Sequence, residues 1–148
     1  SIFLVLMFSG LTIAHLLTKC HECTNMGIIY KEESYKIIGI CMEVHNNLGA
    51  GFSEIVYKDA IEYELEKSKI FFEREKEYSI KYKDVFLKHK FYADFVVFDK
   101  IILELKCCKS ITDSHIAQAM NYLMVSGNKL AIIANFNNDY LEYKRIII

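Results

Sequence analysis

The first part of the chain has apolar residues at the spacing of helices. The segment from Ser34 to Leu48 places its apolar residues on one helical face, and Gly49 supplies a stop. Ser53 is a suitable N-cap for a second helix, SEIVYKDAIEYELEKS (residues 53–68), in which an apolar or aromatic residue recurs at intervals of four. This pattern predicts two helices at the start of the domain. The residues on their apolar faces are Ile37, Ile38, Cys41, Met42, Leu48, Tyr57, Ile61 and Leu65.

After the second helix the period of the apolar residues changes from four to two. EYSIKYK (77–83) and VFLKHK (85–90) both alternate and flank a short turn, which predicts a β-hairpin. FYADFVVF (91–98) and IILELKCC (101–108) are more uniformly apolar and are separated by Asp99-Lys100. A strand that is buried on both faces has this composition, so we expect the last two segments to be core strands.

The remainder of the chain predicts one more helix and two more strands. Thr112 or Asp113 caps a helix that ends at Gly127, and KLAIIANF (129–136) and LEYKRIII (141–148) are strands. The predicted order is therefore α-α-β-β-β-β-α-β-β. Such an order is typical of one α/β domain with a mixed β-sheet flanked by helices, and no linker or internal repeat divides it.

Residues 1–25 differ from the rest of the chain. Their apolar run has the length of a signal-peptide core, but nothing before Lys19 is basic except His15, and the run is short for a membrane span. Met26 is a plausible initiator. We expect residues 1–25 to be a non-native extension, with no membrane association, and residues 26–148 to be the domain. The alternative is a signal peptide or membrane anchor.

The overall charge and the cysteines limit the class of protein. The formal net charge of -1 provides no global positive field for nucleic acid, although a local basic face is compatible with it. The number of cysteines is odd, at five, and Cys107 and Cys108 are adjacent, so a disulfide framework is not expected. Free thiols favour a cytoplasmic location. Cys20 and Cys23 are separated by two residues, but no second pair of ligands follows at the spacing that a structural zinc site needs.

Three charged residues interrupt the two apolar strands within ADFVVFDKIILELK (93–106). Glu104 and Lys106 are two positions apart and therefore lie on one face of their strand. A two-residue turn before this strand would set Asp94 opposite Leu105, on the wrong face. A loop longer by one residue, or a bulge, would set Asp94 opposite Glu104 or Lys106. The sequence leaves both registers open.

Two interpretations of this cluster follow. The charges can neutralise one another as a buried ion pair, which spacing alone favours. Alternatively, two carboxylates form a site for Mg²⁺, which keeps several waters and takes few protein ligands, with the lysine stabilising charge on a phosphoryl oxygen.

Two motifs resemble those of a known family. Asp94 followed by Glu104-Leu105-Lys106 resembles the D…(D/E)-x-K signature of the PD-(D/E)XK nuclease superfamily, and Gly51-Phe52-Ser53-Glu54-Ile55-Val56-Tyr57 matches the pattern of the GxxExxY proteins. The resemblance continues through residues 35–148, and Ala93 stands where the superfamily has its namesake proline. It implies a restriction-endonuclease-like core.

The resemblance also implies roles for individual residues. Asp94 and Glu104 would be ligands of Mg²⁺ or Mn²⁺, helped by the Leu105 carbonyl. Lys106 would be the catalytic lysine, and Glu54 would face the metal from the second helix. Further site candidates are Gln118, on the helix after the ELK strand, and His45 and Tyr57, which otherwise have the positions of core residues.

The function that the resemblance implies is metal-dependent hydrolysis of nucleic acid, with DNA favoured over RNA. Lysines with period two in the predicted hairpin are candidates for contacts with the phosphate backbone, although a solvated strand face has the same pattern. The alternative is an inactive nuclease-fold module that binds nucleic acid or a protein partner. The sequence does not indicate the oligomeric state. The candidate nucleic-acid-binding residues are Lys81, Lys83, Lys88, Lys90 and Lys109.

Overall fold

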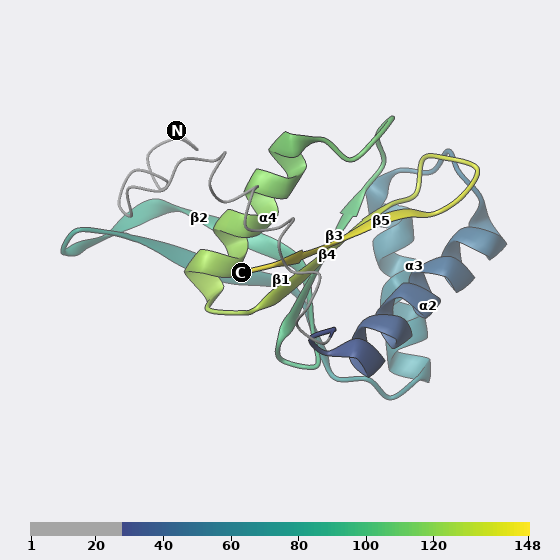
Figure 1. Cartoon of the computed structure of the whole chain (residues 1–148), viewed down its shortest axis with the longest axis horizontal. Helices are drawn as coiled ribbons and strands as arrows, with labels where there is room; N and C mark the ends of the chain where they lie inside the picture. The colour runs from purple at the N-terminus through teal and green to yellow at the C-terminus, as the bar shows by residue number, and fades with distance from the viewer. Residues whose placement is uncertain (1–27) are drawn as a thin grey trace.

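The computed structural model describes residues 28–148, which form three helices and a five-stranded sheet (Figure 1). The predictions for residues 1–25, Met26 and the Cys20–Cys23 pair lie outside these residues. The helices and strands, in chain order, are α2 (Lys31–Leu48), α3 (Glu54–Lys67), β1 (Phe72–Tyr82), β2 (Val85–Val97), β3 (Ile101–Lys106), α4 (Asp113–Ser126), β4 (Leu130–Asn135) and β5 (Glu142–Ile147).

The sheet is mixed, as predicted, with the strands in the order β1-β2-β3-β4-β5. Only β3 and β4 are parallel, and α4 connects them; the other neighbours are antiparallel. This arrangement, with helices on both faces, confirms the predicted restriction-endonuclease-like α/β class. The parallel pair requires a crossover helix, which explains why α4 stands between the strands in the sequence.

One part of the predicted order is wrong. VFLKHK and FYADFVVF are a single strand, β2, so the order is α-α-β-β-β-α-β-β. The β1–β2 ladder runs through the proposed break, with Ser79 opposite Lys90 and Tyr78 opposite Phe91. No turn residue separates Lys90 from Phe91, and the change from exposed to buried side chains along β2 marks where the hairpin leaves the body of the protein.

The two faces of the sheet are covered by different helices. α2 and α3 pack on one face, where Leu103 and Leu105 belong to the core, and α4 packs on the other face, where Ile102 belongs to the core. Since side chains alternate along a strand, Glu104 and Lys106 lie on the α4 face of β3. The far end of the β1–β2 hairpin extends beyond both layers (Figure 1).

The helix boundaries follow the predicted signals with two differences. α2 begins at Lys31, three residues before the predicted Ser34. α4 begins after Thr112, whose hydroxyl accepts the His115 N–H while the Thr112 N–H donates to His115 Nδ1, and it ends at Gly127 with φ of 76°. α3 begins after Ser53 as predicted, but the Ser53 side chain makes no capping hydrogen bond.

Two further observations bear on the sequence predictions. Cys41, Cys107 and Cys108 are free thiols. Among residues 28–148, no helix has both the length and the apolar character needed to cross a membrane.

Candidate metal centre

The turn between β2 and β3 fixes the register that the sequence left open. It has three residues, Phe98–Lys100, and both Phe98 and Asp99 adopt a positive φ of 57°. The resulting ladder places Phe95 opposite Leu103. The ladder ends at this pair, and the next residues, Asp94 and Glu104, are joined through side-chain hydrogen bonds to the opposite strand.

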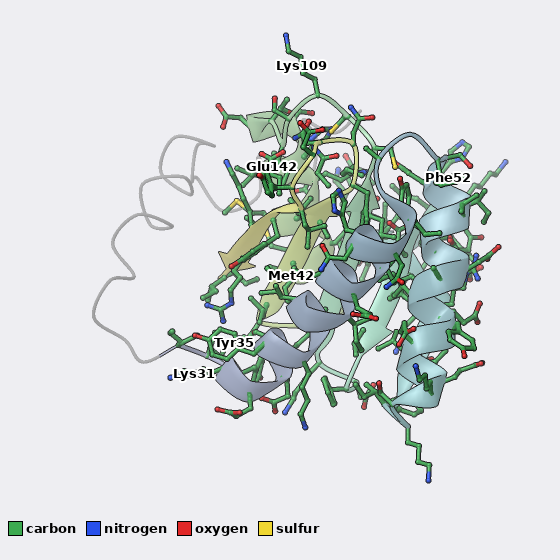
Figure 2. The ribbon with its side chains drawn as sticks, turned by 90° about the vertical axis from the view of Figure 1, so that its right-hand side faces the viewer. Lys31, Tyr35, Met42, Phe52, Lys109 and Glu142 are labelled. Atoms are coloured by element: carbon green, nitrogen blue, oxygen red, sulfur yellow. The ribbon has the colours of Figure 1, made fainter. Side chains whose placement is uncertain are left out.

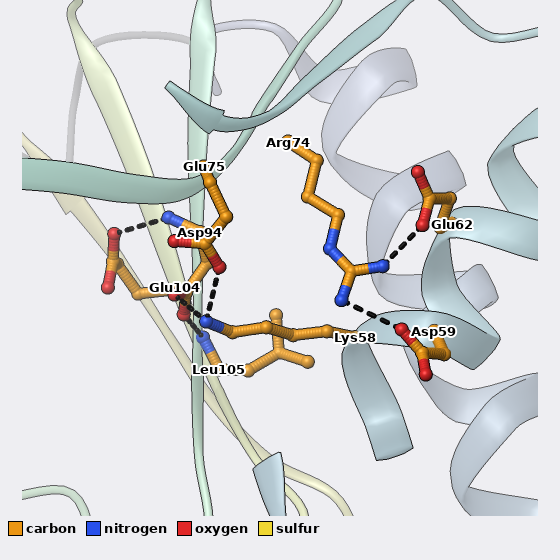
Figure 3. A network of polar contacts seen from close by, with 8 residues as sticks. All are labelled: Lys58, Asp59, Glu62, Arg74, Glu75, Asp94, Glu104 and Leu105. Atoms are coloured by element: carbon orange, nitrogen blue, oxygen red, sulfur yellow. Dashed lines mark hydrogen bonds and ion pairs between the residues drawn. The ribbon is translucent and has the colours of Figure 1, made fainter. Parts of the chain in front are cut away.

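At this point the carboxylates of Asp94 and Glu104 accept the backbone hydrogen bonds that a continued β2–β3 ladder would otherwise satisfy. The Asp94 N–H donates to Glu104 Oε1 at 3.2 Å, and the Leu105 N–H donates to Asp94 Oδ2 at 2.8 Å (Figure 3). The paired register of β2 and β3 ends at Phe95, so these side chains satisfy backbone donors that would otherwise be buried without a partner. Both carboxylates are therefore held in fixed positions where the strands separate.

Burial makes the acid pair unfavourable without a cation. Asp94 is 8% exposed and Glu104 is 5% exposed. Burial and, second, the charge of Asp94 raise the pKa of Glu104 to about 8, against the opposing effects of the Asp94 N–H, Lys106 and Lys58. The Glu104 carboxyl is thus harder to ionise than that of an ordinary glutamate. A divalent cation would relieve the repulsion, and hard carboxylate oxygens are the ligands that Mg²⁺ and Mn²⁺ prefer, so the residues fit such an ion.

Lys106 lies beside the acids and contacts α4. Its Nζ is 3.4 Å from Gln118 Oε1, and Gln118 Nε2 donates to the Tyr122 hydroxyl at 2.9 Å. Burial, followed by the charge of Glu104, raises the pKa of Tyr122 to about 12, so its hydroxyl stays protonated. The structure therefore brings Gln118, a site candidate, to the lysine, and adds Tyr122, which the sequence analysis missed.

Lys58 on α3 is a second residue that the sequence analysis missed. Its Nζ lies 2.5 Å from Asp94 Oδ1 and 2.7 Å from Glu75 Oε1 (Figure 3). Burial acts to lower the pKa of Lys58, but the hydrogen bonds to Asp94 and Glu75 outweigh it and the pKa is raised. Lys58 follows directly after the GxxExxY stretch and lies four residues after Glu54, a spacing that shares one helical face.

The GxxExxY stretch builds the start of α3. Gly49 and Gly51 have positive φ values of 69° and 108°, which side-chain-bearing residues rarely adopt. The fully buried Tyr57 donates its hydroxyl to the Gly49 carbonyl at 2.6 Å and accepts the Phe52 N–H at 3.3 Å, while its ring stacks on Phe136 at 4.6 Å. Tyr57 thus holds the loop that leads into Glu54.

Among residues 28–148, neither Glu54 nor His45 forms a metal-ligand group with the acid pair. Glu54 is half-buried in the first turn of α3, near enough to Cys107 to raise the pKa of that thiol, after the larger effect of burial, to about 11. His45 is buried and its Nε2 lies 2.8 Å from the Asn138 carbonyl oxygen. Within residues 28–148, no three His, Cys, Asp or Glu side chains are grouped closely enough to hold a metal ion. The acid pair itself is the candidate, and Mg²⁺ is commonly held by one or two carboxylates.

The candidate lysines for nucleic acid lie on two exposed segments. Lys81, Lys83, Lys88 and Lys90 are exposed on the β1–β2 hairpin, and Lys90 also pairs with Glu77. Lys109 projects from the loop after β3 (Figure 2).

The buried Asn135 and the half-buried Glu142 hold the loop that carries Lys109. Asn135 bonds both the N–H and the carbonyl of Cys108, at 3.1 and 2.8 Å, and Glu142 accepts the Ile111 N–H. The loop that follows Lys106 is therefore anchored to β4 and β5.

Comparisons with known proteins identify the family and the fold. A family model described as the PD-(D/E)XK nuclease superfamily matches residues 31–146; the GxxExxY group within it stays a prediction. The crystal structure of SSO0001 has a similar fold, with a TM-score of 0.52 at 18% sequence identity. The similarity covers 91% of this chain, which spans 65% of the SSO0001 chain, and at this identity it shows the fold alone. No curated protein matches the sequence significantly.

Proposed function

Since the chain belongs to the PD-(D/E)XK nuclease superfamily, we propose that it is a metal-dependent nuclease that hydrolyses phosphodiester bonds in DNA. The observation that carries this proposal is the acid pair. Asp94 and Glu104 are buried, held by each other's strands, and adjacent to Lys106. The Lys106 ammonium bonds Gln118 rather than either acid, and the cation that pairs with Asp94 is Lys58, from outside the D…(D/E)-x-K signature.

The residues that would hold the cation are Asp94, Glu104 and the carbonyl of Leu105. Nucleases of this superfamily generally use divalent metals, and we propose Mg²⁺, with Mn²⁺ as a substitute. A cation bound there would supply Lewis-acid stabilisation of the negative charge on the phosphoryl group. We assign Glu54 an assisting role from α3, and its effect on cation affinity is expected to be smaller than that of Glu104.

Lys106 would act on the substrate directly. Its ammonium can donate to a phosphoryl oxygen or orient the attacking water, and in either role it offsets the charge that develops during in-line displacement. Gln118 is a positioning residue, because it bonds Lys106 Nζ and is itself held by Tyr122. Tyr57 positions the start of α3, and His45 is expected to contribute to packing.

The substrate would be bound by charged side chains at a distance from the reacting atoms. The exposed lysines of the β1–β2 hairpin and Lys109 support contacts with a phosphate backbone, which gives affinity without reading sequence. We further propose that residues 26–148 act as one domain and that the protein is cytoplasmic, which the free thiols Cys41, Cys107 and Cys108 support.

A cleavage assay tests the proposal. Purified protein is incubated with single- and double-stranded DNA and with RNA, in Mg²⁺, in Mn²⁺ and in EDTA, beside Glu104→Ala and Lys106→Ala. The expected result is cleavage that needs the metal and is lost in both variants. Cleavage that survives both substitutions would reject the assignment, and metal-independent DNA binding without any cleavage would favour the inactive module.

A further inference from the structure

The Lys58 ammonium connects two carboxylates that belong to different parts of the structure. Asp94 Oδ1 lies 2.5 Å away at the acid pair, and Glu75 Oε1 lies 2.7 Å away on β1 (Figure 3). The Lys58 and Asp94 side chains are 13% and 12% exposed, whereas that of Glu75 is 47% exposed. The lysine is thus shared between a buried acid and a solvated one.

α3 is also attached to the sheet through β1, by contacts that do not involve Asp94 of β2. Arg74 on β1 already pairs with Asp59 at 2.8 Å and with Glu62, both on α3. Lys58 adds an ion pair in which the cation lies on α3 and the acid, Glu75, lies on β1. These pairs hold the helix against the strand whether or not Lys58 also contacts Asp94.

Both oxygen atoms of Asp94 are engaged. Oδ2 accepts the Leu105 N–H at 2.8 Å, and Oδ1 accepts the Lys58 ammonium. A cation that bound this carboxylate would meet a positive charge already in contact with it. Two cations that share one buried oxygen repel each other strongly, because the low local dielectric hardly screens them.

We propose that Lys58 competes with the divalent cation for Asp94, and that cation binding moves its ammonium onto Glu75. Lys58 thereby sets the metal affinity of the site and keeps Asp94 paired when no cation is bound. This inference rests on the proposed function, since it requires a cation at Asp94 and Glu104.

Glu75 is suited to receive the ammonium. It already lies within hydrogen-bond distance, and it adopts a φ of 50° inside β1, a left-handed conformation that is uncommon for a residue with a side chain. A strained residue inside a strand persists only where its surroundings maintain it, and here it faces Lys58. A shift of the ammonium from Asp94 to Glu75 exchanges a buried partner for a more solvated one.

Metal affinity provides the first test. Binding of Mn²⁺ and Mg²⁺ alone, without nucleic acid, is measured by calorimetry for the natural sequence, Lys58→Met, Glu75→Gln and Glu104→Gln. Lys67→Met is the matched control, since Lys67 lies on the same helix with a 65% exposed side chain. Lys58→Met is expected to bind about tenfold more tightly or better, and Glu75→Gln more weakly, because Lys58 then has only Asp94 as a charged partner.

The double variant separates the two roles of Glu75. If Glu75 acts through Lys58, then Glu75→Gln changes affinity much less in the Lys58→Met background than alone. An equal effect in both backgrounds would show that Glu75 acts on the cation only through its own charge, which overturns its assigned role.

A labelling measurement on the natural sequence makes the test independent of whether Lys58→Met folds. Reductive methylation of lysines is followed by mass spectrometry with and without saturating Ca²⁺. The rate at Lys58 is expected to rise several-fold with the cation while the rate at Lys67 stays unchanged. An unchanged rate at Lys58 would overturn the competition.

The outcomes distinguish this inference from the proposed function. In one outcome, the natural sequence binds the cation tightly, Glu104→Gln abolishes binding, and Lys58→Met leaves it unchanged or weakens it. That result would overturn the competition but retain the metal site. Failure of both the natural sequence and Lys58→Met to bind any of the cations would remove the metal site, and the competition with it.

Discussion

Asp94 and Glu104 hold each other's strands: the Asp94 N–H donates to the Glu104 carboxylate at 3.2 Å, and the next residue after Glu104 donates its N–H to the Asp94 carboxylate at 2.8 Å. The backbone pairing of β2 and β3 stops at Phe95, and beyond it these two side chains accept the backbone N–H groups. The two acids are therefore fixed without using Lys106, which remains available to act on a substrate.

The first prediction concerns stability and pH. Because the pKa of Glu104 is about 8 in the folded protein against 4.5 for an ordinary glutamate, the unfolded chain loses this proton first as the pH rises. Folding stability should therefore fall between pH 4.5 and about 8, by up to about 1.4 kcal/mol per pH unit from this residue, and level off above.

Urea denaturation of the protein and of Glu104→Gln in EDTA measures this effect. The amide keeps the acceptor for the Asp94 N–H and has no proton to lose, so the variant should be more stable above pH 8 by roughly 1–3 kcal/mol. Glu66→Gln, an exposed position on α3, serves as the control. Identical pH profiles for all three proteins would contradict the buried, protonated Glu104.

The second prediction separates catalysis from cation binding. Lys106→Met should reduce cleavage by about a hundredfold or more, because the charge developing on the phosphoryl group loses its donor, while Mn²⁺ affinity is retained. Lys67→Met, an exposed position on α3 with no assigned role in the site or in DNA binding, should cleave with an almost unchanged maximal rate. Loss of cation binding in Lys106→Met would show that this lysine maintains the acid pair instead.

The third prediction concerns the start of α3. Tyr57→Phe removes the donor to the Gly49 carbonyl and the acceptor of the Phe52 N–H but keeps the ring stacked on Phe136. We expect a loss of about 1–3 kcal/mol in the free energy of unfolding, measured with urea. Tyr63→Phe, which is 61% exposed on the same helix, should change it by less than about 0.5 kcal/mol. Equal effects would mean that the Tyr57 hydroxyl does not hold the loop.

The fourth prediction concerns the hairpin. Alanine at Lys81, Lys83 and Lys88 should weaken DNA binding about equally for unrelated sequences and reduce the slope of log affinity against log salt by about one per lost phosphate contact. Fluorescence anisotropy in Ca²⁺ at several salt concentrations measures this. Lys67→Ala on α3 is the control. A salt slope unchanged in the triple variant would show that the hairpin lysines are a solvated strand face and do not contact phosphates.

Much of the fold is predictable because its periodicities are local. The helical face of α3, the capping of α4 and the apolar strands β3 and β4 agree with the sequence patterns. The face of α2 agrees except at Met42, which the pattern predicts on the apolar face and which is 41% exposed. The division of β2 into two strands was wrong because the change in composition at Phe91 marks a change of environment, from an exposed hairpin to the core, within one continuous strand.

The candidate site is predictable only in part. The sequence leaves the Asp94 register open because the turn depends on Phe98 adopting a positive φ, which local preferences do not favour for an aromatic residue. Lys58 was missed because its partners, Glu75 and Asp94, lie on strands that only the tertiary fold brings to α3. Tyr122 carries a local signal, since it lies one helical turn after Gln118.

The most direct test of the central claim, that Asp94 and Glu104 hold one divalent cation, is a crystal structure of the protein soaked with Mn²⁺, with the anomalous signal used to locate the ion. We predict one ion bound by an oxygen from each carboxylate at about 2.1–2.2 Å, with the Lys58 ammonium moved toward Glu75. An ion bound elsewhere, or both carboxylates retaining their present contacts at saturating Mn²⁺, would contradict the account.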